Sequence, residues 1–136
     1  MTLDRHPHRA LSREEKARLR SIVEEIEHET GVEIAAVIIP HVQDIEAFAT
    51  AYFNHLGIGK REHDNGILVA VVVDRRLVRI EVGRGLRDVV TSELASRIIS
   101  DVMAPQLRQG RYGEAVLRAV EALGHIVRTA HPHLSR

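Results

Sequence analysis

Two short polar segments hold the residues whose types and spacing suit the binding of a divalent cation. The first is Asp64-Asn65-Gly66, directly before an apolar run, and the second is Gly83-Arg84-Gly85, with Asp88 three residues later. Calcium and magnesium ions take several oxygen ligands, so Asp64, Asn65, Asp88 and loop carbonyl oxygens can form one site if the segments meet. The alternative is that Asp-Asn-Gly is only a turn leading into a strand, since all three residue types favour turns.

The chain between the two segments predicts how they meet. Residues 67–73 are continuously apolar, which is typical of a strand covered on both faces, and residues 74–76 have the composition of a turn. The return strand alternates, with apolar residues on one face and two charged residues on the other. Pairing the strands about residues 74–76 places Gly66 opposite Arg84. Both polar segments are therefore expected at one end of the sheet.

Glu81 is a further acidic candidate for this site. It shares a face of the return strand with Arg79, two residues away. In a functional role, Glu81 would bind the metal ion itself, or it would contact the metal-binding residues and fix their orientation. In a structural role, it would lie on a solvated face or form ion pairs that contribute little to stability. The predicted metal-binding residues are Asp64, Asn65, Glu81 and Asp88.

Other chemistries have less support in the sequence. Gly83-Arg84-Gly85 lies shortly before a helix start and can bind an anion on backbone amides, but it lacks the third glycine and the Lys-Ser/Thr of nucleotide loops. Of the nine histidines, only His63 lies next to the proposed site, where it can act as an acid or a base. The chain has no cysteine, which excludes disulfides, a thiolate nucleophile and zinc–thiolate sites.

The flanking elements follow from capping residues and hydrophobic spacing. Before the strand pair, we expect a helix from the capping box Ser12/Glu15 to Gly31, a strand over 32–39 and a helix capped by Asp44. After it, we expect a helix that is capped by Thr91 or Ser92 and that Pro105 ends or kinks. A last helix follows Gly110. With the strand pair, this order predicts an α/β fold, a three-layer α/β/α sandwich with a small mixed β-sheet flanked by about four helices. We expect a single domain over residues 12–130, a flexible arm over 1–11 and a flexible tail over 131–136.

Composition limits the classes of partner. The 136 residues are 44% hydrophobic and 28% charged, which is typical of one soluble globular domain. Lys plus Arg and Asp plus Glu both number 19, and aromatic residues are scarce, so we expect no nucleic-acid binding. There is no apolar signal core at the amino end and no apolar run of membrane-spanning length. We therefore expect no direct membrane insertion and a cytoplasmic location, unless the chain belongs to a longer protein.

Five segments, taken together and in order, resemble the TPM domain family, which groups thylakoid-lumen phosphatase-like proteins, photosystem II repair proteins and a receptor modulator with many bacterial proteins. Within a match from about Leu11 to Val127, the segments are Thr30-Gly31-Val32-Glu33-Ile34-Ala35, Gly57-Ile58-Gly59-Lys60, Asp64-Asn65-Gly66-Ile67-Leu68, Asp74-Arg75-Arg76 and Arg79-Ile80-Glu81-Val82-Gly83-Arg84-Gly85-Leu86. The resemblance implies an α/β/α sandwich, a divalent-cation site usually described with calcium and, in some plant members, acid phosphatase activity. The chain departs from the family where the usual Gly-Leu-Glu is Gly85-Leu86-Arg87, and where a common acidic position is Ser92.

Three functions follow from these observations. The first is a TPM-type interaction or regulatory module that binds Ca²⁺, with Mg²⁺ as the alternative ion, and acts on an unidentified protein partner or on a second copy of itself. The second is a metal-dependent acid phosphatase, in which the ion activates water, Arg84 or Arg87 stabilises charge and His63 donates a proton. The third is a metal-free scaffold domain, which the arginine at position 87 favours.

Overall fold

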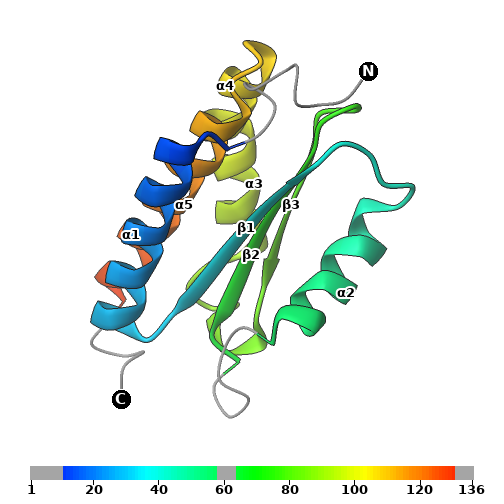
Figure 1. The fold of residues 1–136 in the computed structure, drawn as a ribbon. Coiled ribbons are helices and arrows are strands. Elements are labelled where there is room, and N and C mark those ends of the chain that lie inside the picture. The colour runs from blue at the N-terminus through cyan, green and yellow to red at the C-terminus, as the bar shows by residue number, and fades with distance from the viewer. Residues whose placement is uncertain (1–10, 58–63, 131–136) are drawn as a thin grey trace.

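The computed structural model describes residues 11–57 and 64–130, and these form three layers around a central sheet (Figure 1). The elements are α1 (Arg13–Thr30), β1 (Glu33–Ile39), α2 (Ile45–Leu56), β2 (Gly66–Val72), β3 (Leu77–Val82), η3 (Arg84–Leu86), α3 (Ser92–Arg97), η4 (Ile98–Met103), α4 (Ala104–Arg108) and α5 (Tyr112–Thr129). Helices α1 and α5 and the continuous helix α3–η4–α4 lie on one side of the sheet, and α2 lies on the other. The predicted α/β/α sandwich with a small mixed sheet and about four helices is confirmed.

The predicted helix starts carry their expected caps. The Glu15 backbone N–H donates to Ser12 Oγ at 3.1 Å, and the Ser12 N–H donates to the Glu15 carboxylate at 2.9 Å. Asp44 caps α2, and Thr91 rather than Ser92 caps α3. Apart from Leu11, the predicted arm and tail lie outside the described residues. Within the described chain, no helix combines the length and the apolar character needed to cross a membrane.

Strand β2 is the centre of the mixed sheet. It pairs in parallel with β1 and antiparallel with β3, so β1 and β3 are the two edge strands. All seven residues of β2 are buried, because helices cover both of its faces. This burial explains the continuous apolar run that identified the strand in the sequence.

The β2–β3 hairpin is one residue away from the predicted register. Gly66 lies opposite Gly83, whose N–H donates to the Gly66 carbonyl at 2.8 Å, and not opposite Arg84. The reason is the turn, which has the four residues 73–76 because Val72 and Leu77 are the last paired residues. Arg76 completes this turn with a left-handed φ of 54°. A four-residue turn moves the centre of the hairpin by half a residue, and every cross-strand pair shifts by one.

The third predicted helix continues past Pro105. Residues Ile98–Met103 widen into a π-helix, in which the Ala104 N–H donates to the Ile99 carbonyl five residues earlier. Pro105 has no N–H, and its ring would clash with the carbonyl of Asp101 in a regular α-helix. Widening the preceding turn moves that carbonyl away from the ring, so the helix runs on to Arg108.

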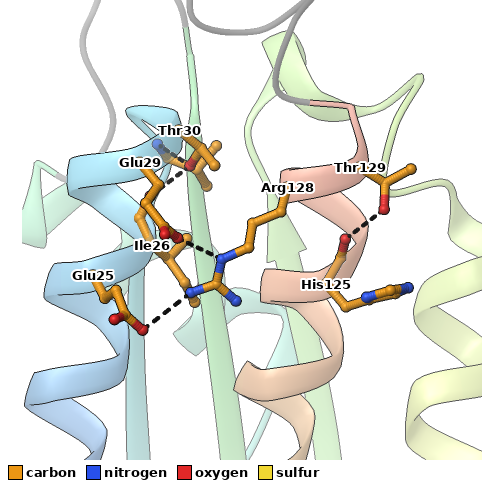
Figure 2. A network of polar contacts seen from close by, with 8 residues as sticks. Glu25, Ile26, Glu29, Thr30, His125, Arg128 and Thr129 are labelled. Atoms are coloured by element: carbon orange, nitrogen blue, oxygen red, sulfur yellow. Dashed lines mark hydrogen bonds and ion pairs between the residues drawn. The ribbon is translucent and has the colours of Figure 1, made fainter.

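Helices α1 and α5 pack closely beside each other on the sheet. A Cβ atom on Gly124 of α5 would lie 2.6 Å from Cδ1 of Ile26 in α1, so glycine allows this approach. Nearby, Arg128 donates from Nε to Glu29 at 2.5 Å and from Nη2 to Glu25 at 3.3 Å (Figure 2). The three side chains are between 38% and 67% exposed, so water screens these ion pairs.

Replacing Arg128 by alanine is therefore expected to have a small effect. The free energy of unfolding should fall by about 1 kcal/mol or less, because exposed ion pairs contribute little. Urea unfolding of both proteins at low and at high salt measures the difference, which should shrink as salt screens the charges. A loss that is several times larger and independent of salt would show that packing of the Arg128 stem dominates.

Candidate metal site at the Asp64 end of the sheet

The two polar segments meet at one end of the sheet, as the hairpin predicted. We call this region, residues 64–66 and 83–88, the Asp64 end. The Gly85 N–H donates to the Asp64 carbonyl at 3.1 Å, next to the bond between Gly83 and Gly66. These two backbone bonds hold the loop before β2 against the loop after β3.

Gly83 allows the two loops to come this close. A Cβ atom at position 83 would lie 2.2 Å from the carbonyl oxygen of Asp64 and 3.2 Å from the amide nitrogen of Gly66. The φ angle of Gly83 is −62°, which any residue can adopt. Glycine is therefore needed here for space and not for backbone conformation.

Asp64 presents its carboxylate at the surface of this end. Its backbone is left-handed, with φ of 49°, a conformation that aspartate tolerates better than most residues. Its Oδ2 atom lies 3.3 Å from Nε of Arg84, and the two side chains are 39% and 78% exposed. A cation that binds Asp64 competes with Arg84, and the solvated ion pair opposes this only weakly.

Asn65 fixes the same loop to the turn between α1 and β1. Its Nδ2 atom donates to the Gly31 carbonyl at 2.6 Å, and its backbone carbonyl accepts the Glu33 N–H at 3.1 Å. An amide oxygen such as Oδ1 of Asn65 has the chemistry to bind a cation. The sequence did not predict this contact, because no local pattern shows that residue 65 meets residue 31.

Glu81 and Asp88 lie at different places near this end. Glu81 of β3 lies opposite Leu68 of β2, and its side chain is 15% exposed. Its carboxylate accepts a hydrogen bond from Nε of Arg79 at 3.2 Å, so both side chains lie on the same strand face, as predicted. Asp88 is exposed in the turn that follows η3. Across residues 11–57 and 64–130, no three acidic or histidine side chains cluster closely enough to hold a metal ion. The part of the chain that the structure describes thus offers separate oxygen donors and no complete cage.

The glycine loop is less suited to an anion. The N–H groups of Gly83 and Gly85 already donate to the carbonyls of Gly66 and Asp64, and the Leu86 N–H donates to the Gly83 carbonyl at 2.9 Å. A phosphate bound on backbone amides would have to break these bonds. His63, the predicted acid or base, lies outside the described residues.

Comparison with known proteins identifies the family. A family model described as the TPM domain matches residues 6–126, which is most of the chain. The chain belongs to the TPM domain family. This TPM domain is 30% identical to the N-terminal domain of a protein from P. gingivalis, solved by NMR, with a TM-score of 0.83 over 95% of this chain and 83% of that one.

A second solved structure supports the fold of the TPM domain. The BA42 protein of the psychrophilic bacterium Bizionia argentinensis, also solved by NMR, is 21% identical, with a TM-score of 0.77 over 89% of this chain and 83% of that one. No curated protein matches the chain. The family resemblance found in the sequence is therefore confirmed by the family model and by the P. gingivalis domain, while the BA42 structure supports the fold.

Proposed function

We propose that this TPM domain binds Ca²⁺ at the Asp64 end and that the bound ion regulates a surface for a protein partner. The observation that carries this proposal is the position of the Asp64 carboxylate. It is solvent-accessible, its backbone is fixed by Gly85, and among the described residues it forms one ion pair, with the exposed Arg84. Backbone carbonyl oxygens, Oδ1 of Asn65 and the Asp88 carboxylate are the further oxygen donors within the two loops.

The donor set predicts weak binding. Sites with few carboxylates and with ligands on flexible loops have dissociation constants on the order of 10⁻⁴ to 10⁻³ M, as in extracellular calcium modules. Glu81 is paired with Arg79, so it would not bind the ion directly. Its negative charge at the end of β3 would support the residues that do. An ion bound to Asp64 would compete with Arg84 and add positive charge beside residues 83–88, which changes the surface that a partner meets.

Two variants test the cation site in opposite directions. Asp64→Asn keeps a residue that tolerates the left-handed backbone but removes the charge, so Ca²⁺ should no longer raise the melting temperature. Arg84→Ala removes the competing cation, so the calcium affinity should rise about threefold or more. For the natural protein, Ca²⁺ at about 100 times the dissociation constant should stabilise the fold by about 2.7 kcal/mol.

Calorimetric titration and thermal unfolding, each with and without Ca²⁺, measure both effects. Mg²⁺ at the same concentrations tests the choice of ion. The proposal is wrong if the natural protein gives no binding heat and if Ca²⁺ leaves all three melting temperatures unchanged. That result would support the metal-free scaffold.

The alternative function as a phosphatase has weaker support. The backbone N–H groups of Gly83, Gly85 and Leu86 are used within the loop. The resemblance implies phosphatase activity only for some plant members of the family. Metal-dependent turnover of a phosphomonoester that disappears in Asp64→Asn would nevertheless establish it.

A further inference from the structure

Within the part of the chain that the structure describes, no strand pairs with β3 on the side away from β2, and backbone groups of β3 face that side. In an antiparallel pair, hydrogen-bonded and non-hydrogen-bonded residues alternate. Because Gly83 bonds to Gly66, the residues Val78, Ile80 and Val82 are the non-bonded ones, and their N–H and C=O groups point outward. The side chain of Arg87 confirms this direction, since its Nε donates to the Val82 carbonyl at 3.4 Å.

A groove runs along this edge, between β3 and the helix formed by α3 and η4. It encloses about 390 Å³. The helix side of the groove carries mostly small or hydroxyl-bearing residues, including Ser92, Ala95 and Ser96. Strand β3 contains no proline and no lysine, two residue types that commonly protect an edge strand from pairing, and its charged residues are Arg79 and Glu81. There is thus both a backbone template and lateral room for another strand.

The sequence of β3 is complementary to itself when reversed about Ile80. In an antiparallel pair of two copies centred there, Arg79 of each copy lies opposite Glu81 of the other, and Val78 lies opposite Val82. Val78, Ile80 and Val82 would form the hydrogen-bonded pairs, because their backbone N–H and C=O groups point toward the partner strand. Arg79 and Glu81 would form the non-bonded pairs, in which facing side chains come closest.

We propose that the protein forms a homodimer in which two β3 strands pair antiparallel about Ile80. The two three-stranded sheets become one sheet of six strands. On one face, the two Arg79 and the two Glu81 side chains alternate in charge, which extends the pair seen within each chain at 3.2 Å. The long, exposed bond from Arg87 to the Val82 carbonyl gives way to a backbone bond from the partner strand. The strand pairing itself needs no bound cation, and it meets the Asp64 end at Glu81 and Arg87.

Charge reversal provides a sharp test. Arg79→Glu places two glutamates opposite two glutamates in the dimer, and Glu81→Arg places two arginines opposite two arginines. Each variant alone should dimerise about tenfold or more weakly than the natural protein, since two cross-strand pairs become repulsive. An equimolar mixture of the two variants restores both attractive pairs and should form a heterodimer. The double variant R79E/E81R should dimerise like the natural protein.

Sedimentation velocity over a concentration series measures these equilibria, and circular dichroism verifies that each variant is folded. A natural protein that stays monomeric up to about 1 mM would overturn the proposal and leave the edge to a strand of another protein. A dimer that neither single reversal weakens, or a mixture without a heterodimer, would also overturn it.

A backbone variant checks the strand pairing itself. Val78→Pro removes an N–H that faces outward, so the β2–β3 bonds remain while a hydrogen bond to the partner is lost. We expect a folded, largely monomeric protein. An undiminished dimer in folded Val78→Pro would contradict pairing through β3. If this variant does not fold, the charge-reversal mixture decides the question.

Discussion

Replacing Gly83 by alanine should lower the free energy of unfolding by about 3 kcal/mol, the upper range for an overpacked site. The new Cβ would lie 2.2 Å from the Asp64 carbonyl oxygen, which is much closer than van der Waals radii allow. The clash is with the backbone, so no side-chain rotation relieves it. The loops can separate only by breaking the bonds from Gly83 to Gly66 and from Gly85 to Asp64. The same separation should abolish calcium binding.

Gly57→Ala is the matched control for this prediction. A Cβ on Gly57 would contact nothing within 4 Å, but its φ of 63° is unfavourable for alanine. Its expected cost is therefore only the left-handed backbone penalty of about 1 to 2 kcal/mol. Urea unfolding of both variants compares the two effects. A Gly83→Ala protein as stable as Gly57→Ala would mean that the two loops are not held together as described.

The second large effect is expected at Leu86, the buried anchor of the glycine loop. Leu86 is fully buried, its N–H donates to the Gly83 carbonyl, and its carbonyl accepts the Val90 N–H at 2.7 Å. Leu86→Ala should lower the free energy of unfolding by about 2 to 5 kcal/mol, through lost burial and the cavity left behind. Because the loop depends on this anchor, calcium affinity should fall together with stability.

Leu56 provides the same substitution at an exposed position. Its side chain is 38% exposed at the end of α2, so Leu56→Ala should cost about 1 kcal/mol or less. Chemical denaturation of the two alanine variants, followed by a calcium titration of each, separates the anchor from a general loss of stability. Equal costs for the two substitutions would show that Leu86 does not anchor the loop.

The sequence predicted those parts of the fold that depend on local patterns. The Ser12 capping box, the Asp44 cap and the buried β2 strand each have a signal within a few residues, and each is confirmed. The hairpin register was wrong by one, because it depends on the left-handed conformation of Arg76. The sequence left open whether Pro105 ends or kinks its helix, since the π-helix that lets the helix continue leaves no distinct pattern in the sequence.

The candidate site was predicted in its location but not in its contacts. Hairpin topology alone brings Asp64 next to the glycine loop, and a register error of one residue does not change this. The bond from Asn65 to Gly31 and the ion pair between Asp64 and Arg84 depend on side-chain orientation across segments distant in sequence. Such contacts have no periodic signal. These two contacts affect how the side chains of Asn65 and Asp64 can bind a cation.

Calcium binding at the Asp64 end is tested most directly by NMR, with amide shifts recorded while Ca²⁺ is added from zero to millimolar concentrations, followed by a chelator. We predict saturable shifts centred on residues 64–66 and 83–88, reversed by the chelator and absent in Asp64→Asn. A flat titration, or shifts that persist in Asp64→Asn, would contradict a calcium site built on Asp64.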